Sequence, residues 1–368
     1  MGADSNRYPD GSRELAEAVG RLLIIGFEGS DFAEIEGLLL KFRPAGLIFF
    51  KRNYPGPDDP EAPLKLRTLI ERAQALAEME LGRRLFVAID HEGGRVQRLP
   101  APYTLLPPAG AARTGPLNVE QMAGLAGRGA RELAATGFNF NFAPVLDVAS
   151  PLSSLMGDRC FSDDPAEVAA YALAVLRAYH QAGILGAGKH FPGLGAATVD
   201  PHHELPTVPS DLQRLREVDL PPFRALMEEG LLAIMTTHAL YPALDRERPA
   251  TVSEDIVGLI KNESFPGALL TDDLEMGAVV KNYPMGEAAV NAIRAGHDLA
   301  LVCRQAEYVE ECRTALAAAV RQGDLSESRL NDAWGRSDLL RRRLAGLRPD
   351  QAVLDGWFEA LMAAGQRL

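Results

Sequence analysis

The sequence has 368 residues, and its 50 acidic side chains outnumber the 38 basic ones, which gives a formal charge of −12. Nucleic acids and anionic membranes bind proteins through an excess of Lys and Arg, so this charge argues against both partners. No apolar stretch approaches the roughly 18 residues that cross a bilayer. Residues 1–13 are polar and contain no apolar signal core. We therefore expect a cytoplasmic globular protein with no membrane segment.

The chain contains three cysteines, Cys160, Cys303 and Cys312. This odd and sparse set suits a reducing compartment, and it provides neither a disulfide framework nor a four-ligand zinc site. We expect all three to be packed thiols.

Short apolar runs alternate with longer helical patterns along the whole chain, which is typical of repeated βα units around a parallel sheet. The expected strands cover residues 22–27, 46–51, 85–90, 138–147, 185–190, 232–238, 268–273 and 298–303. Eight strands, each followed by a helix, predict a closed (β/α)₈ TIM-type barrel. Two further helices are expected at 326–344 and 351–364. Because no Gly-, Ser- or Pro-rich linker divides the chain, we expect one domain over 1–368, with the barrel at about 20–323 and C-terminal helices at about 324–368.

Two of the expected helices have clear start signals. Asp164 precedes Pro165 and stands three residues before Glu167, which predicts a capping box at the start of a helix over 165–182. Ser210 and Gln213 predict a second capping box ahead of residues 212–229. Two consecutive prolines, at 221 and 222, must break or kink that second helix.

Charged residues gather where the expected strands end, and in a (β/α)₈ barrel these ends carry the reactive groups. The third strand ends in Asp90 and the fourth in Asp147, and the fifth ends in Lys189 and His190 before a loop of about twenty residues. The remaining polar residues at these ends and on that loop are Glu92, Arg95, Arg98, Asp200, His202, His203, Glu204, His238, Asp272 and Asp273. Their common location predicts a polar site at one mouth of the barrel.

Several reaction classes fit these residues poorly. A two-metal hydrolase typically needs a His-x-His pair on a strand, and the adjacent His202 and His203 point apart on extended backbone, so no metal or other cofactor is expected. Cys303 has no nearby His to activate it, and the loops after the last two strands are not rich in glycine, as phosphate sites usually are. A strand-end carboxylate facing Lys and Arg, with a titratable group on a loop, suits glycoside cleavage. Asp272 fits the carboxylate role, and because successive strand residues point to opposite sides, we expect one of Asp272 and Asp273 to be structural.

Four segments together resemble glycoside hydrolase family 3, and within it the NagZ-type β-N-acetylglucosaminidases of peptidoglycan recycling. They are IDHEGGRVQR at 89–98, NFNFAPVLD at 139–147, KHFPG at 189–193 and TDDLEM at 271–276. The similarity runs from about Leu22 to Cys303 with the order and spacing of the motifs kept.

The resemblance implies that Asp272 is the nucleophile that forms a covalent glycosyl-enzyme. It also implies that the sugar hydroxyls are held by Asp90, Arg159, Lys189 and His190, with support from Arg98. These groups are chemically apt, because Arg and Lys donate to hydroxyl oxygens and Asp accepts from hydroxyls.

NagZ-type members carry an Asp-Ser-His step on the loop after the fifth strand, and this chain has Asp200-Pro201-His202 there. The resemblance implies that His202 is the general acid/base and that Asp200 orients it. An imidazole, with its ordinary pKa of about 6.5, suits both halves of that role near neutral pH. Pro201 replaces the usual Ser and predicts a stiffer loop, while Leu194 replaces a usual His and removes a polar group near the site.

The sequence therefore predicts a retaining exo-β-N-acetylglucosaminidase whose small carbohydrate substrate contains GlcNAc, with muropeptide fragments as the expected source. A β-glucosidase-like member of the same family stays open, because Asp90, Arg159, Lys189 and His190 would hold either sugar. Those larger relatives usually take their acid/base from a second domain. A sugar-binding barrel that has lost catalysis is the alternative outside the enzymes.

Overall fold

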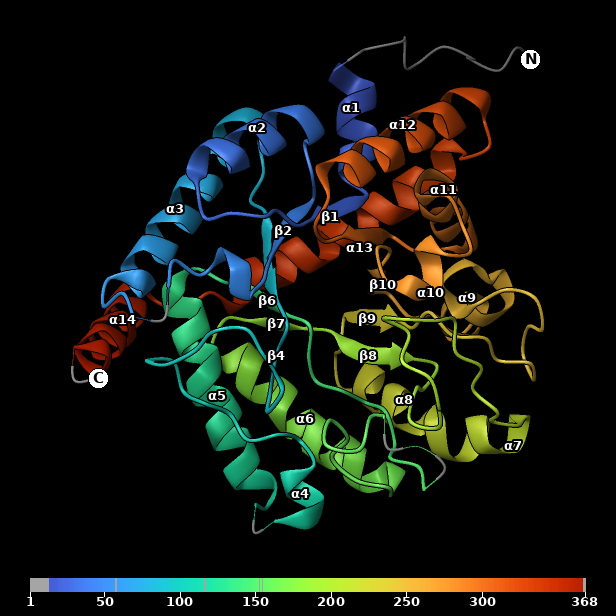
Figure 1. The fold of residues 1–368 in the computed structure, drawn as a ribbon, viewed down its shortest axis with the longest axis horizontal. Coiled ribbons are helices and arrows are strands. Elements are labelled where there is room, and N and C mark those ends of the chain that lie inside the picture. The colour runs from blue at the N-terminus through green and yellow to red at the C-terminus, as the bar shows by residue number, and fades with distance from the viewer. Residues whose placement is uncertain (1–12, 57, 116, 152, 154, 367–368) are drawn as a thin grey trace.

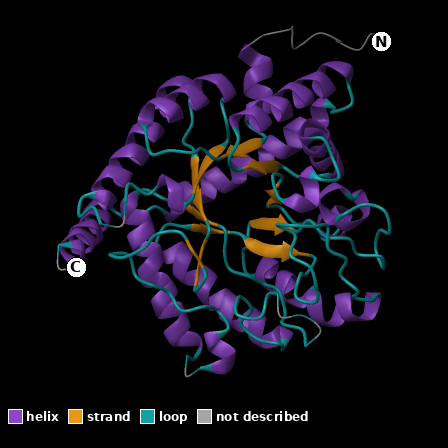
Figure 2. Cartoon of the chain, in the orientation of Figure 1, coloured by secondary structure: helices purple, strands orange, loops and turns teal. Residues whose placement is uncertain are grey.

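The computed structural model describes residues 13–56, 58–115, 117–151, 153 and 155–366. The expectation about the amino-terminal segment concerns residues 1–12, which lie outside this range. In the described residues, the strands form a ring that is surrounded by helices (Figure 2). None of the helices in the described ranges combines the length and apolarity needed to cross a membrane.

The strands form one parallel sheet in the order β7-β6-β3-β2-β1-β11-β10-β9-β8 (Figure 1). Its two end members, β7 (Leu185–Gly186) and β8 (Gly188–Phe191), are consecutive parts of a single segment, so the sheet closes into a barrel of eight strands. The others are β1 (Leu23–Ile25), β2 (Gly46–Phe49), β3 (Phe86–Ile89), β6 (Phe140–Asn141), β9 (Ala233–Thr236), β10 (Ala268–Asp273) and β11 (Leu299–Val302). The predicted (β/α)₈ fold is confirmed. Strand four is shorter than predicted, since beyond Asn141 only Val145 bridges to the neighbouring Lys189.

The buried side chains form two cores, as the alternation of side chains along a strand requires. Along β3, Phe86 and Ala88 pack inside the barrel. Val87 and Ile89 of the same strand pack outward against the surrounding helices. Both faces are apolar, which explains why the strands read as continuous hydrophobic runs in the sequence.

Helices fill the connections between strands. The longer ones are α1 (Arg13–Gly20), α2 (Phe32–Phe42), α3 (Ala62–Leu81), α5 (Val119–Thr136), α6 (Pro165–Gln181), α8 (Pro221–Glu228), α9 (Glu254–Lys261), α11 (Met285–Ala295) and α12 (Ala306–Gln322). Shorter pieces are the hairpin β4 (His91–Gly93) and β5 (Val96–Gln97), α4 (Ala111–Thr114), α7 (Leu212–Arg214), α10 (Gly277–Val280), the 3₁₀ turns η1 (Lys51–Asn53) and η3 (Ala250–Val252), and the π-helical turn η2 (Leu215–Asp219). The three cysteines are buried free thiols, as predicted.

The two capping predictions had different outcomes. Asp164 accepts hydrogen bonds from the first backbone N–H groups of α6, but the Glu167 carboxylate accepts from Ser162 Oγ and closes no box. The prediction for Ser210 is wrong, because Asp211 caps α7 and the Ser210 hydroxyl donates to the buried carboxylate of Asp219. The buried Asp219 carboxylate thus receives the Ser210 hydroxyl as a donor, while the exposed Asp211 carboxylate accepts the N–H of Arg214. The break at the two prolines is confirmed, since α8 begins at Pro221.

The two C-terminal helices are α13 (Glu327–Leu347) and α14 (Gln351–Gly365), close to their predicted positions. Helix α13 crosses the barrel at the amino-terminal ends of the strands (Figure 1). Leu340 is fully buried in the interior core, and Arg336 Nη1 donates to the carbonyl oxygens of Phe265 and Gly267, at 2.6 and 2.8 Å. This helix therefore closes the end of the barrel that lies opposite the site.

We expect Leu340→Ala to lower the free energy of unfolding by about 3 kcal/mol, because it leaves a cavity in a fully enclosed position. Arg342→Ala, at an exposed position of the same helix, is expected to change it by less than about 0.5 kcal/mol. Urea denaturation of the two variants measures the difference. Equal stabilities would show that α13 does not close the core.

Candidate active site

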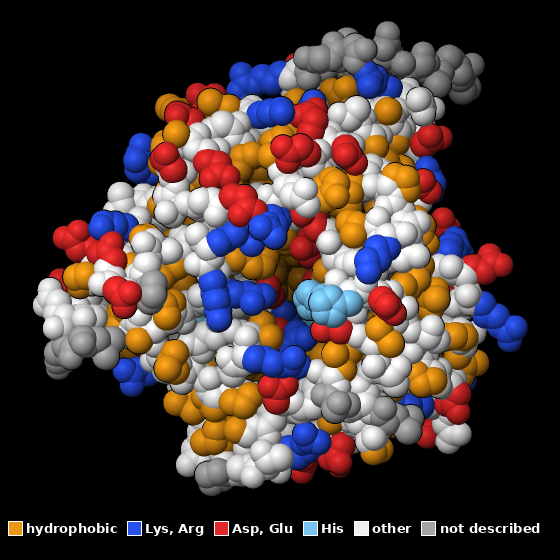
Figure 3. All heavy atoms as spheres, in the orientation of Figure 1, with side chains coloured by type: hydrophobic (Ala, Val, Ile, Leu, Met, Phe, Trp, Pro, Cys, Tyr) orange, Lys and Arg blue, Asp and Glu red, His pale blue; other side chains and the backbone are white. Residues whose placement is uncertain are grey.

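The carboxyl ends of the strands and the loops that follow them form one face of the protein (Figure 3). This face is hollowed near its centre, and Lys or Arg side chains and histidine border the hollow. The structure brings the sequence-predicted site residues to this face, as expected from their positions at the strand ends.

Glu92 joins four of the predicted residues into one ion-pair network. Its carboxylate accepts from Arg159 Nε and Nη2 at 2.8 and 2.7 Å, and from Lys189 Nζ at 2.7 Å. Lys189 Nζ also donates to Asp90 Oδ1 at 2.8 Å, and Arg98 Nη2 reaches Asp90 Oδ2 at 3.3 Å. The sequence analysis gave Glu92 no role. Its position two residues after Asp90, on the same side of an extended segment, was the available signal.

The charges of this network hold one another in the ionised state. Burial raises the pKa of Glu92, but Arg159 and Lys189 outweigh burial and hold that pKa well below its usual range. Burial also raises the pKa of Asp90, and Lys189 and Arg98 outweigh it in the same way. Burial lowers the pKa of Lys189, while the two carboxylates raise it above its ordinary value. The network is therefore fully charged near neutral pH.

We expect Glu92→Gln to lower the free energy of unfolding at pH 7 by about 3 kcal/mol, because it leaves two buried cations without their shared partner. A carboxylate whose pKa is depressed by folding stabilises the protein above its unfolded pKa of about 4.3, and this contribution disappears as the pH falls. The difference in the free energy of unfolding between wild type and Glu92→Gln should therefore become smaller as the pH falls from 5 to 3.

Urea denaturation across that pH range tests the expectation. Glu229→Gln removes an exposed ion pair with Arg177 and is the matched control, with an expected cost below about 1 kcal/mol at any pH. A Glu92→Gln penalty that does not depend on pH would contradict the assignment.

Asp147 fixes His190 and the start of the following loop. Its buried carboxylate accepts from His190 Nδ1 at 2.7 Å and from the backbone N–H of Leu194 at 2.6 Å. Arg159 Nη2 lies 3.3 Å from the other ring nitrogen of His190. The Leu194 side chain is buried in the outer core, so the absence of a histidine there is compensated by apolar packing.

The adjacent carboxylates Asp272 and Asp273 have different surroundings, as predicted. Asp273 accepts from the backbone N–H groups of Glu275 and Cys303, at 3.0 and 3.2 Å, and so fixes the turn after β10. Burial, together with Glu275, raises the pKa of Asp273 to about 7. Asp272 accepts the N–H of Asp273 at 2.8 Å, and no Lys, Arg or His within the described ranges forms a salt bridge with it.

Asp272 nevertheless lies among basic groups. Burial raises its pKa, but His190, His238 and Lys189 outweigh burial and keep the pKa below its ordinary value. The sequence analysis noted His238 at a strand end without giving it a role. Its Nε2 donates to the carbonyl oxygen of Asp273 at 2.8 Å, and its Nδ1 is bonded to the Thr251 hydroxyl. Asp272 is thus an ionised carboxylate without a salt bridge to any described residue.

Asp200 and His202 form a hydrogen-bonded pair on the loop after β8. His202 Nδ1 lies 2.7 Å from Asp200 Oδ1, and the His202 ring is largely exposed. The loop is attached to α10, which follows the strand that carries Asp272. Ala278 N–H donates to Pro201 O at 3.0 Å, and Gly277 N–H donates to His202 O at 3.1 Å. A Cβ at position 277 would come within 2.7 Å of that carbonyl oxygen, so the close approach requires glycine.

These features describe a barrel enzyme with a free ionised carboxylate, a charged polar cradle and an exposed imidazole–carboxylate pair, which is the equipment of a glycoside hydrolase. No group of three or more His, Cys, Asp and Glu side chains that could hold a metal ion occurs in the described part of the chain. The family model of the glycosyl hydrolase family 3 N-terminal domain matches residues 14–337. The chain belongs to glycosyl hydrolase family 3 and is an enzyme of that class.

Individual relatives agree with the family. A protein named beta-hexosaminidase from Methylococcus capsulatus is 39% identical over 279 residues, which cover 74% of this chain and 79% of the relative. A family 3 beta-N-acetylglucosaminidase structure from Paenibacillus is 35% identical with a TM-score of 0.82, and the match covers 90% of this chain but only 62% of that one. The structure of NagZ from Neisseria gonorrhoeae in complex with N-trifluoroacetyl-D-glucosamine is 28% identical with a TM-score of 0.72, over 94% and 97% of the two chains.

Proposed function

We propose that the protein is a retaining exo-β-N-acetylglucosaminidase that removes terminal β-linked GlcNAc from muropeptide fragments. The observation that carries this proposal is the ionised carboxylate of Asp272, free of any salt bridge in the described ranges and next to the charged cradle. The Asp200–His202 pair, on a loop that is hydrogen-bonded to α10, supplies the proton donor in this proposal.

In this proposal the cradle binds the hydroxyls of the terminal sugar. Lys189 Nζ has three N–H donors and donates two of them to Asp90 and Glu92, so one is left for a sugar hydroxyl. Arg98 supports the cradle through the contact of its Nη2 with Asp90 Oδ2 at 3.3 Å. His190 is held in place by Asp147 and presents Nε2, beside Arg159, to a sugar hydroxyl. Arg159 is held by Glu92, and its Nη1, whose partner is Met156 Sδ at 3.4 Å, has a second N–H to offer a hydroxyl.

The reaction then has two steps. Asp272 attacks the anomeric carbon while His202 protonates the leaving oxygen, which gives a covalent glycosyl-enzyme and a free aglycone. His202, now neutral, takes a proton from a water molecule whose oxygen attacks the same carbon and releases Asp272. Two inversions give net retention. Asp200 orients the imidazole through Nδ1 and leaves Nε2 for the proton transfer.

The choice of GlcNAc is supported by the relatives, whose names are beta-hexosaminidase and beta-N-acetylglucosaminidase, and by the N-trifluoroacetyl-D-glucosamine complex of the Neisseria protein. The location of the Asp200–His202 pair within the barrel also favours this activity over a β-glucosidase that takes its acid/base from another domain. The muropeptide source follows from the resemblance to NagZ-type enzymes.

Hydrolysis of an aryl β-GlcNAc and of the matched aryl β-glucoside tests the proposal. We expect kcat/KM to favour the GlcNAc substrate by at least about 100-fold, and a preference for glucose would overturn the assignment. GlcNAc binding without release of aryl alcohol over hours would identify a non-catalytic barrel instead. Release of GlcNAc from a GlcNAc–MurNAc-peptide, followed by mass spectrometry, tests the muropeptide source. Cleavage of chitin fragments alone would refute it.

A further inference from the structure

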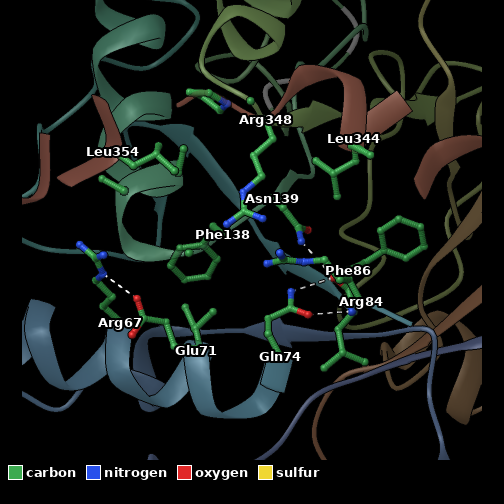
Figure 4. Close-up of a pocket in the computed structure, with 18 of the residues that line it drawn as sticks. Arg67, Glu71, Gln74, Arg84, Phe86, Phe138, Asn139, Leu344, Arg348 and Leu354 are labelled. Atoms are coloured by element: carbon green, nitrogen blue, oxygen red, sulfur yellow. Dashed lines mark hydrogen bonds and ion pairs between the residues drawn. The ribbon is translucent and has the colours of Figure 1, made fainter. Parts of the chain in front are cut away.

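A second cavity lies at the other end of the barrel, away from the carboxyl ends of the strands. It has a volume of about 480 Å³. Helix α3, the end of α5 with the residues that follow it at 137–139, the start of β3, and the connection between α13 and α14 form its walls (Figure 4). Its volume falls within the range of about 300 to 1,000 Å³ that is typical of small-molecule sites.

One part of the wall is apolar. The Phe138 side chain lies near those of Leu344 and Leu354 (Figure 4), and Ile70 and Pro349 also line the cavity. The other part is basic, since the guanidinium of Arg348 points into the cavity and Arg84 and Arg341 also line it (Figure 4). The cavity is therefore amphipathic and cationic, within a protein whose net charge is −12.

The carboxylates of the wall leave these cations poorly neutralised. Glu71 is taken by Arg67 at 2.8 Å, and Glu78 lies 3.5 Å from Arg84. Arg348 forms no ion pair in the described part of the chain, and its only side-chain partner there is the amide oxygen of Gln351 at 3.4 Å.

Arg341 is the third arginine of the lining. Its Nη2 donates to the carbonyl oxygen of Ala45 at 3.2 Å, its Nε lies 3.8 Å from Asp338 Oδ1, and its buried Nη1 has no hydrogen-bond partner in the described structure. Its guanidinium lies 4.2 Å from the centre of the Phe86 ring. Burial lowers the pKa of Arg341 to about 9, and burial and Arg348 lower that of Arg84. Arg84 and Arg341 thus each have a single carboxylate at 3.5 to 3.8 Å, and Arg348 has none in the described part of the chain, so the lining favours an anionic occupant.

We propose that this cavity binds an amphipathic organic anion, a carboxylate or phosphate monoester attached to an apolar body. Its charged group lies between Arg84, Arg341 and Arg348, and its apolar body lies against Phe138 and the C-terminal helices. Such a ligand contacts α3 and the connection between α13 and α14 at once, so it ties the C-terminal helices to the barrel. This inference does not depend on the reaction at the other end of the barrel.

The test uses two fluorescent probes of the same shape, anilinonaphthalene sulfonate and the uncharged N-phenyl-1-naphthylamine. We expect the sulfonate to bind with a stoichiometry of one, to raise the melting temperature and to bind at least about tenfold more tightly than the neutral probe. The double variant R84Q/R348Q should weaken sulfonate binding by at least about tenfold. Ala75→Trp, which places a large ring at the exposed rim of the cavity, should block it. Arg342→Gln, on an exposed face of α13 that does not line the cavity, should leave it unchanged.

Other outcomes would overturn the proposal. Equal binding of the sulfonate to wild type, R84Q/R348Q and Ala75→Trp would place the probe elsewhere, and displacement by GlcNAc would place it at the mouth of the barrel. Equal binding of both probes would show an apolar groove without anion recognition. Displacement by inorganic phosphate at the same concentration would show a site for charge alone. Melting curves of each variant confirm that the protein remains folded in these comparisons.

Discussion

Replacing Asp272 by Asn is expected to lower kcat/KM by at least about 10⁴-fold on every substrate, including activated aryl β-GlcNAc, because no other group can form the glycosyl-enzyme. The amide keeps the shape and can still accept the N–H of Asp273, so the fold and GlcNAc binding should be preserved. Steady-state kinetics, with calorimetric titration of GlcNAc, measures both properties.

Asp273→Asn is the matched control for this experiment. Asp273 accepts two backbone N–H groups, and an amide oxygen can accept them as well, so we expect activity within about tenfold of wild type. An inactive Asp273→Asn protein beside an active Asp272→Asn protein would reverse the roles of the two residues.

Replacing His202 by Ala is expected to lower the rate on natural disaccharides by roughly 10² to 10⁴-fold, the usual contribution of a general acid/base. Activated aryl glycosides should lose less in the first step, because their leaving groups depart without a proton. The second step still needs a base, so the glycosyl-enzyme accumulates and pre-steady-state kinetics shows a burst of aryl alcohol. Asp200→Ala should show a weaker form of the same pattern, since it removes only the orienting partner.

His203→Ala is the control for His202, because the two residues are adjacent and both exposed, and only the His202 ring is paired with Asp200. We expect His203→Ala to leave the rates of both steps nearly unchanged. A burst that appears with His203→Ala and is absent with His202→Ala would mean that the acid/base is the other histidine.

The fold was predictable because its signals are local and repeated. Each buried strand is a short apolar run followed by a helical pattern, and eight such units leave few alternatives to a closed barrel. The limits appear where a distant group decides a local structure. The Ser210 hydroxyl bonds to Asp219 instead of capping a helix, and that choice depends on the burial of the Asp219 carboxylate. The position of α13 across the barrel end likewise depends on tertiary contacts of Leu340 and Arg336.

The candidate site was also predictable only in part. The convergence of Asp90, Lys189 and Asp272 follows from their positions at the ends of parallel strands, and the different roles of Asp272 and Asp273 follow from strand alternation. The hydrogen-bond and ion-pair partners of these residues could not be predicted from the sequence. Glu92 bridges Arg159 and Lys189 because one loop and two strands bring three distant segments together. Asp147 likewise binds His190 and Leu194 across more than forty residues of sequence.

The covalent intermediate is the central claim, and mass spectrometry of the protein after reaction with an activated fluorinated GlcNAc glycoside tests it most directly. The fluorine slows the second step, so the glycosyl-enzyme persists long enough for digestion and sequencing of the labelled peptide. We predict one sugar per chain, attached to Asp272, and no label in the Asp272→Asn variant. A label on any other residue, or turnover of the fluorinated substrate with no labelled protein at any time, would contradict the account.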